Sequence, residues 1–297
     1  MGHSAFPDSF RPFDVQTSAA TIHGLIGGSG PPLLLLHSIP ETDLMWRNVA
    51  PALAERFTVV ATDLRGFGDS GAPSPDQEGI DYSMRGLAGD QAEAMTALGF
   101  DTFAVAGHDR GARCAYRLAI DHPARVRRLA ALDIVPTGDA FERADAEFAL
   151  GFWVWSFLGA PAPVPETLIQ HAPEAFVGSM LNAWPDPAYR FPPEIRERYV
   201  RQFTEPERLR AICAQYREAA KTDRAMDLAD RARRPISCPT LVLWSSAGPV
   251  GQWYQPLDVW RAWARDVEGH GLPGGHFCPE EVPQLVAQEL ARFFGAG

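Results

Sequence analysis

The feature that most constrains the fold is the alternation of short apolar runs with helical patterns along the 297-residue chain. Such alternation is typical of a mostly parallel sheet with helices on both of its faces. Apolar runs predict strands at residues 33–38, 57–63, 103–108, 127–134 and 239–246. Amphipathic patterns predict helices at residues 45–55, 83–99, 110–122 and 279–294. Ahead of these elements, residues 13–28 predict a short antiparallel hairpin.

The alternation stops between about Pro136 and Pro235. This stretch is rich in Pro, Trp, Phe and Arg, and its patterns predict helices and no strand. We therefore expect an α/β core formed by residues 1–135 and 236–297, with residues 136–235 inserted as a helical cap. A cap in this position would lie over the carboxyl ends of the strands, where open α/β folds bind their ligands.

Composition argues against several classes of function. The formal net charge of −10 disfavours a nucleic-acid surface, because such a surface needs basic patches. For the same reason, a small anionic substrate would need a local cationic clamp. The four cysteines form no Cys-x-x-Cys pair, which favours reduced thiols in a cytoplasmic protein. The chain opens without a signal-peptide pattern, and its apolar runs are too short for a bilayer, so no membrane partner is expected.

The segment Gly107-His-Asp-Arg-Gly111 joins a predicted strand to a predicted helix. Gly-x-Asp-x-Gly fits the nucleophile-elbow pattern, in which a tight turn projects one side chain away from the sheet. Asp109 takes the position that Ser usually holds. A carboxylate there can displace a leaving group from an sp3 carbon and form an alkyl ester. The simpler alternative is that Asp109 only caps the helix that follows.

Two further residues complete a candidate triad with Asp109. His276 lies in the loop before the last predicted helix, where this arrangement places the base that activates water. The acid that orients the base is expected after one of two core strands, and only the earlier strand ends in a carboxylate, Asp133. The chain order Asp109, Asp133, His276 therefore supplies one candidate for each role, although Asp133 could be only a strand-end cap.

The loop after the first parallel strand, residues 37–46, is the expected place for an oxyanion hole. The backbone N–H groups of Ile39 and Arg110 would stabilise negative charge on the ester oxygen during hydrolysis. Ser38 stands where this loop usually has Gly.

Five segments, GHDRGAR, LDIVPT, WSFLGAPAPVPE, PLDVWRAWA and GGHFCPEE, resemble the fluoroacetate dehalogenases, which are haloacetate hydrolases of the α/β-hydrolase superfamily. The resemblance covers nearly the whole chain. It implies an α/β-hydrolase fold with a helical cap, and hydrolytic dehalogenation of short 2-haloacids. It implies Asp109 as nucleophile, Asp133 as orienting acid and His276 as base, with neither a cofactor nor a metal. Many members of the family are homodimers, so a homodimer is possible here.

The resemblance also implies how the substrate is held. Arg110 and Arg113 correspond to the pair that binds the substrate carboxylate, and guanidinium groups match carboxylates bidentately. Arg113 could instead be a solvated helix residue. Trp155 and Tyr216 correspond to halide-binding residues of the cap, although both could simply pack its interior.

One residue departs from the family pattern. Where the family has a halide-binding His before the Trp, this chain has Val154. A third halide donor is therefore missing unless Trp153, His171 or an ordered water takes its place. This difference puts activity on fluoroacetate in doubt.

Two other functions remain open. An epoxide hydrolase shares the Asp nucleophile and the capped fold, and it needs two cap tyrosines to protonate the epoxide oxygen. Tyr216 could be one, with Tyr189 or Tyr199 as the second. Arg110 disfavours this reading, because epoxide hydrolases commonly have Trp after the nucleophile. A non-catalytic binding protein of the same fold is the third possibility, and a complete triad argues against it.

Overall fold

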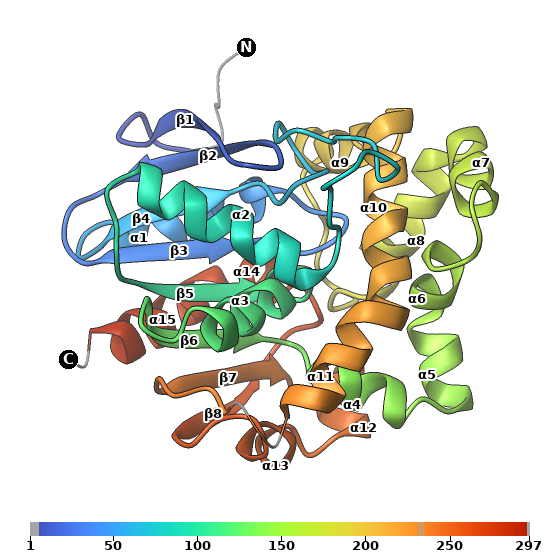
Figure 1. The fold of residues 1–297 in the computed structure, drawn as a ribbon. Helices are drawn as coiled ribbons and strands as arrows, with labels where there is room; N and C mark the ends of the chain where they lie inside the picture. The colour runs from blue at the N-terminus through green and yellow to red at the C-terminus, as the bar shows by residue number, and fades with distance from the viewer. Residues whose placement is uncertain (1–5, 232, 234, 296–297) are drawn as a thin grey trace.

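The computed structural model describes residues 6–295 except 232 and 234. Its centre is an eight-stranded sheet in the order β1-β2-β4-β3-β5-β6-β7-β8 (Figure 1). The strands are β1 (Arg11–Gln16), β2 (Thr21–Gly27), β3 (Pro32–Leu36), β4 (Thr58–Thr62), β5 (Phe103–His108), β6 (Val126–Leu132), β7 (Thr240–Ser245) and β8 (Val267–Leu272). β1 and β2 form the expected antiparallel hairpin, and β2 is also antiparallel to β4. The strands from β4 through β3 to β8 pair in parallel, so the predicted mostly parallel sheet is confirmed.

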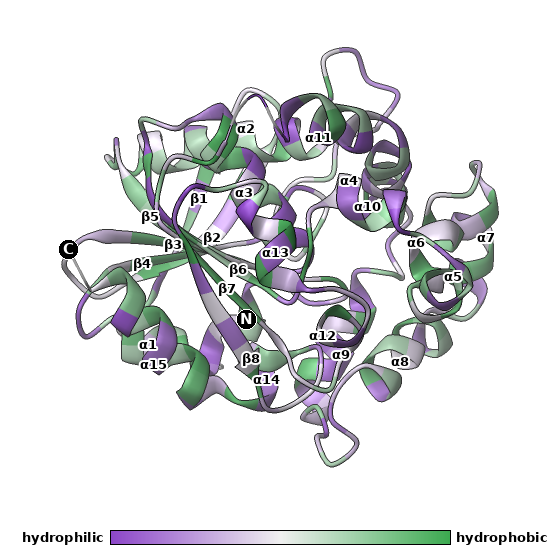
Figure 2. Cartoon of the chain, turned by 90° about the horizontal axis from the view of Figure 1, so that it is seen from below, coloured by the Kyte–Doolittle hydropathy of each residue, from purple (hydrophilic) through white to green (hydrophobic). Residues whose placement is uncertain are grey.

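Helices cover both faces of this sheet. One face carries α2 (Met84–Ala97), α3 (Arg110–Asp121) and α13 (Pro256–Arg261), and the other carries α1 (Ala50–Leu53), α14 (Cys278–Glu281) and α15 (Pro283–Phe294) (Figures 1 and 2). Because both faces are covered, the central strands are apolar along their length, as in the fully buried run Leu33–Leu36. Within the described part of the chain, no helix has the length and apolar character needed to cross a membrane.

A second group of helices separates β6 from β7 in the chain. These are α4 (Thr137–Glu142), α5 (Ala146–Gly151), α6 (Trp153–Leu158), α7 (Val164–His171), α8 (Pro173–Ala183), α9 (Pro193–Arg201), α10 (Pro206–Glu218), the π-helical turn η2 (Ala219–Asp223) and α11 (Arg224–Asp230). Figure 1 shows most of this group beyond the carboxyl ends of the parallel strands. None of the described residues between 136 and 235 lies in a strand. The division of the chain at residues 135 and 236 stays a prediction.

Three details differ from the sequence-based expectation. Strand β8 has no predicted counterpart. The helix expected at residues 45–55 is a 3-10 helix, η1 (Asp43–Asn48), followed by the short α1. The helix expected at 279–294 is broken at Val282 into α14 and α15. In both helical segments the second part begins with a proline in its first turn, because proline fits the start of a helix and interrupts its interior.

Candidate active site

Asp109 lies in a strained turn between β5 and α3. Its φ of 43° and ψ of −110° lie outside the regions that residues with a Cβ normally adopt. The turn needs glycine on both sides: a Cβ on Gly107 would lie 2.3 Å from the carbonyl oxygen of Gly111, and a Cβ on Gly111 would lie 2.3 Å from that of Leu36. The Asp109 carboxylate makes no capping hydrogen bond to α3. The local fold therefore presents this carboxylate without using it as a helix cap.

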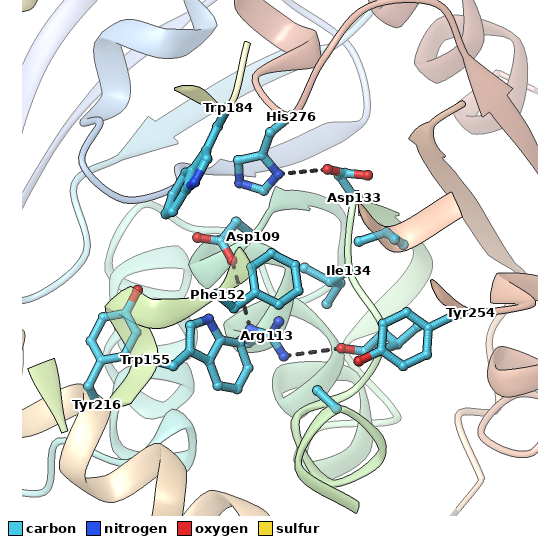
Figure 3. Close-up of a pocket in the computed structure, with 13 residues that line it drawn as sticks. Asp109, Arg113, Asp133, Ile134, Phe152, Trp155, Trp184, Tyr216, Tyr254 and His276 are labelled. Atoms are coloured by element: carbon cyan, nitrogen blue, oxygen red, sulfur yellow. Dashed lines mark hydrogen bonds and ion pairs between the residues drawn. The ribbon is translucent and has the colours of Figure 1, made fainter. Parts of the chain in front are cut away.

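His276 and Asp133 meet beside Asp109. The Nδ1 of His276 donates to Oδ2 of Asp133 at 2.6 Å, and the other Asp133 oxygen accepts the backbone N–H of Ser245 at 2.8 Å. Figure 3 shows the imidazole with Asp133 on one side and the carboxylate of Asp109 on the other. With Nδ1 engaged, Nε2 is the nitrogen left to act on a water near Asp109.

The charges around these groups favour a carboxylate nucleophile and a basic imidazole. Burial opposes ionisation of Asp109, but the neighbouring His276 and Arg113 outweigh it and lower the pKa of this carboxyl. Burial also opposes the protonation of His276, yet its hydrogen bond to Asp133 and the charge of that carboxylate raise the pKa of the imidazole. Asp109 is therefore ionised at neutral pH, and His276 is a stronger base than an ordinary histidine.

A second buried histidine supports the first. The Nε2 of His108 donates to the carbonyl oxygen of His276 at 2.7 Å, and its Nδ1 lies 3.7 Å from Oε2 of Glu41. Burial lowers the pKa of His108 to about 3, so its ring is neutral. The backbone N–H of His276 donates in turn to the carbonyl of Trp184 at 2.9 Å. His276 is thus held by its backbone from both the sheet and the helical insertion.

Asp109, Asp133 and His276 line one pocket (Figure 3). Six of its lining residues are among those predicted from the sequence: Asp109, Arg113, Asp133, Trp155, Tyr216 and His276. The other seven were not predicted from the sequence; they are Ile134, Val135, Ala140, Phe152, Trp184, Val250 and Tyr254. Ile134 and Val135 directly follow Asp133, and that adjacency was an available signal. Phe152, Trp184 and Tyr254 come from distant loops with no local pattern.

Arg113 turns one edge of its guanidinium toward Asp109. Nη1 donates to the carbonyl of Val135 and to the hydroxyl of Thr137, both at 3.1 Å. Nε lies 3.9 Å from Oδ1 of Asp109, and neither Nε nor Nη2 donates a hydrogen bond to any described residue. The guanidinium carbon also lies 4.4 Å from the ring centre of Trp155. The Nε and Nη2 edge, which is the side-on fork of the guanidinium, therefore lies toward Asp109 without a hydrogen bond to a described residue.

Arg110, the other arginine expected at the substrate carboxylate, lies against Tyr216. It does not line the pocket, and its guanidinium carbon lies 4.7 Å from the ring centre of Tyr216, which does. Its Nη2 donates to the backbone and side-chain oxygens of Gln215 at 3.3 Å. Its Nε and Nη1 are buried and have no hydrogen-bond partner in the described part of the chain. Burial lowers the pKa of this guanidinium.

The structure brings Trp155 and Tyr216 together, with ring centres 6.4 Å apart and planes at 77°. Val154 is buried but outside the pocket lining. Neither candidate for the missing donor reaches the lining: Trp153 is 36% exposed, and exposed His171 bonds to the carbonyl of Thr167. Neither Trp153 nor His171 therefore reaches the pocket to replace the missing halide-binding His.

The two tyrosines considered beside Tyr216 also lie elsewhere. Tyr189 and Tyr199 both donate to Glu280, at 3.0 and 2.7 Å, and neither lines the pocket. The second tyrosine that lines the pocket, beside Tyr216, is Tyr254.

The expected oxyanion loop passes next to the elbow. The hydroxyl oxygen of Ser38 lies 3.4 Å from Oδ2 of Asp109. The N–H groups of Ile39 and Arg110 have no acceptor among the described residues, so both remain free to bind a developing oxyanion.

One trio of side chains has the spacing of a metal site. Ligand atoms of His108, Asp133 and His276 lie within 4.8 Å of one another. Asp133 and His276 are bonded to each other, and His108 is bonded to the His276 carbonyl. Because Asp133 and His276 bond directly to each other, this pair matches the acid and base of the candidate triad, and His108 supports it from behind.

Comparison with known proteins places this geometry in context. The alpha/beta hydrolase fold family matches residues 31–282. A fluoroacetate dehalogenase from Burkholderia sp is 41% identical over 280 residues, which are 94% of this chain and 92% of that protein. A soluble epoxide hydrolase from Corynebacterium sp. (strain C12) is 34% identical over 283 residues, covering 92% and 93%. A Pseudomonas aeruginosa protein provisionally named an epoxide hydrolase, solved as a variant with MFA bound, is 42% identical with a TM-score of 0.92, covering 98% and 97%.

Proposed function

The chain belongs to the alpha/beta hydrolase fold family, and from that premise we propose that it hydrolyses the carbon–halogen bond of short 2-haloacids. Its relatives include a fluoroacetate dehalogenase and a soluble epoxide hydrolase, which supports a hydrolase and leaves the substrate to be argued from the pocket.

The observation that carries the proposal is the free fork of Arg113 beside Asp109. Buried donors in proteins are normally hydrogen-bonded, so the buried and unpartnered Nε of Arg113 in this pocket calls for an anionic ligand. A 2-haloacid supplies a carboxylate for the fork, with the halogen-bearing carbon next to it. Nε of Arg113 lies 3.9 Å from Oδ1 of Asp109, so a substrate carboxylate bound to Arg113 would lie next to the nucleophile. The free nitrogens of Arg110 would add positive charge behind Tyr216.

The first chemical step is a displacement by Asp109. A carboxylate oxygen attacks carbon 2 of the substrate, a C–O bond forms, and the halide leaves with the bonding electrons. The indole N–H of Trp155 and the phenol of Tyr216 are the donors proposed to stabilise the departing halide. The product of this step is an ester between Asp109 and the acid.

The second step returns the enzyme to its initial state. The Nε2 of His276 takes a proton from water, and the resulting hydroxide attacks the ester carbonyl of Asp109. The N–H groups of Ile39 and Arg110 stabilise the oxyanion. Collapse breaks the bond between the Asp109 carbonyl carbon and the ester oxygen, and the leaving alkoxide takes the proton of the added hydroxyl, which frees the 2-hydroxyacid and restores the carboxylate. His276 then loses its proton to solvent.

A second candidate is epoxide hydrolysis with the same nucleophile. Its support is the presence of two tyrosines, Tyr216 and Tyr254, in the pocket lining, together with the epoxide hydrolase relative. Epoxide opening would use a phenol to protonate the departing oxygen. It would leave the Arg113 fork unpartnered, and for that reason we rank it second.

A substrate panel tests the choice. We expect steady release of halide from chloroacetate and bromoacetate, and no diol from small epoxides. Fluoride release should be slower than chloride release by about 10²- to 10³-fold, because fluoride leaves with most difficulty and one hydrogen-bond donor is missing at Val154. Ion chromatography measures all three halides under the same conditions.

Each part of the panel can contradict a separate claim. Diol formation without halide release would establish the epoxide reaction instead. Equal rates for fluoroacetate and chloroacetate would show that no donor is needed at Val154. Binding of haloacetate with no turnover would indicate a non-catalytic binding protein.

The proposed base sets the pH dependence. His276 must be neutral to accept a proton, so kcat should rise as the pH rises through its pKa. Because Asp133 raises that pKa, the midpoint of the acidic limb should lie above the ordinary histidine value of 6.5. Steady-state kinetics with chloroacetate between pH 5 and 9 measures it. A midpoint below 6.5, or a flat profile, would contradict His276 as the base in the slow step.

A further inference from the structure

A continuous line of buried hydrogen bonds connects Arg113 with Asp227 in α11, outside the pocket. Nη1 of Arg113 donates to Oγ1 of Thr137 at 3.1 Å, the hydroxyls of Thr137 and Tyr116 are 3.2 Å apart, and Tyr116 donates to Oδ2 of Asp227 at 2.7 Å. All four side chains are buried, and only Arg113 lines the pocket. We call this set the Asp227 relay.

Tyr116 joins Asp227 to Thr137. Tyr116 has one proton, and an ionised Asp227 accepts it. The Tyr116 oxygen accepts the backbone N–H of Thr137 at 3.1 Å, and the Tyr116 hydroxyl lies 3.2 Å from Oγ1 of Thr137, which accepts from Nη1 of Arg113. Asp227 therefore holds Tyr116 in place, and Tyr116 holds Thr137. Thr137 in turn holds Nη1 of Arg113.

Resting on the proposed function, we propose that Asp227 is a positioning residue for the substrate-binding fork of Arg113, acting through Tyr116 and Thr137. A guanidinium is planar, so holding Nη1 at Val135 and Thr137 determines where the Nε and Nη2 edge points. That edge faces Asp109 and is the one without a hydrogen-bond partner in the described part of the chain.

The local fold explains how Asp227 reaches this place. The π-helical turn η2 adds a wider turn between α10 and α11, which rotates the residues that follow it. The backbone N–H of Gly138 donates to Oδ2 of Asp227 at 2.8 Å. A Cβ on Gly138 would lie only 2.8 Å from Cβ of Asp227, so glycine permits this close approach of α4 and α11.

The charges facing Asp227 come from three neighbouring elements. They are Arg113, Tyr116 and Arg117 of α3, the Gly138 N–H of α4, and Asp223 of η2. Burial raises the pKa of Asp227 to about 6, against the lowering effects of Gly138, Tyr116 and the two arginines. The relay is thus complete above about pH 6 and loses its acceptor charge below it. A looser Arg113 at low pH should appear as a higher KM for an anionic substrate.

Thr137 offers a matched pair of variants for the test. Thr137→Val removes the hydroxyl and keeps the shape, whereas Thr137→Ser keeps the hydroxyl. We expect Thr137→Val to raise KM for chloroacetate about fivefold with kcat nearly unchanged, because a fork that holds the carboxylate in both ground and transition states affects binding uniformly. Thr137→Ser should stay within about twofold of the parent. The rise of KM below pH 6 should be present in the parent and flattened in Thr137→Val.

Controls separate this role from a structural one. Asp230→Asn changes another aspartate of α11, which pairs with Arg117 at 2.8 Å, and should leave KM unchanged. If Thr137→Val does not fold, Tyr116→Phe breaks the same relay and is judged by the same rise in KM. Equal KM values for Thr137→Val and Thr137→Ser would overturn the proposal, as would a pH dependence of KM that Thr137→Val retains.

Calorimetry with acetate on the same proteins keeps the two proposals separate. If the parent releases no halide, the proposed function is wrong. The relay would still predict about fivefold weaker acetate binding in Thr137→Val than in the parent. Acetate affinity that is equal in parent and Thr137→Val would overturn the relay even if halide is released. A parent that neither releases halide nor binds acetate would overturn both.

Discussion

Replacing His276 with Asn should stop turnover after one halide per protein molecule. The first step needs only Asp109, so the variant should still form the ester and release halide once. The second step loses its base, and kcat should fall by on the order of 10⁴-fold. Incubation with chloroacetate should then give a protein whose intact mass includes the acid, and proteolysis should place the addition on Asp109.

A second histidine provides the control for this experiment. His270→Asn alters a half-exposed histidine of β8 that faces Glu289 and lies outside the pocket, and it should keep parental turnover. A halide burst from His276→Asn with unmodified Asp109 would remove Asp109 as the nucleophile. Full turnover by this variant would remove His276 as the base.

Replacing Arg113 with Lys should lower kcat/KM for chloroacetate by about 10²-fold. Lysine keeps the positive charge but loses the side-on fork, and hydrogen bonds to a charged group contribute about 1.5–3 kcal/mol each. Most of the loss should lie in KM, because the carboxylate is bound alike before and during displacement. Steady-state halide release gives both constants.

The matched control is Arg85→Lys, in a half-exposed arginine of α2 that pairs with Asp121. It should leave both constants unchanged. The parent should also prefer chloroacetate strongly over chloroacetamide, which has the same leaving group and no carboxylate. Equal turnover of the two compounds would show that Arg113 does not bind a substrate anion.

The sheet was predictable where residues are buried on both sides. The segments that form β3 and β5 are nearly uniform apolar runs, because helices cover both faces of the sheet there. β8 has the sequence VEGHGL, with two glycines and alternating exposure, because it is the last strand of the sheet. An edge strand of this kind has no apolar run, so its place in the sheet depends on pairing with β7, which local sequence does not encode.

The candidate site divides in a similar way. Asp109 and Asp133 each follow a predicted core strand, and His276 lies in the loop before the last predicted helix, so chain order alone suggests their meeting. The place of Arg110 depends on its contacts with Gln215 and Tyr216 of α10. Gln215 lies 105 residues further along the chain, so local sequence does not predict the contact. Tyr254 reaches the pocket from the residue that follows α12 (Pro249–Trp253), and no local sequence pattern marks it.

The backbone of the elbow has a consequence for anyone who evolves this protein in the laboratory. In the described part of the chain, Asp109 and Asp133 are the two residues other than glycine with positive φ, at 43° and 52°. Such conformations cost on the order of 1–3 kcal/mol each, which glycine would avoid. A library screened for heat resistance alone would therefore accumulate glycine at these two positions and yield robust, inactive proteins. Directed evolution for stability has to hold both codons constant, or screen every round for turnover.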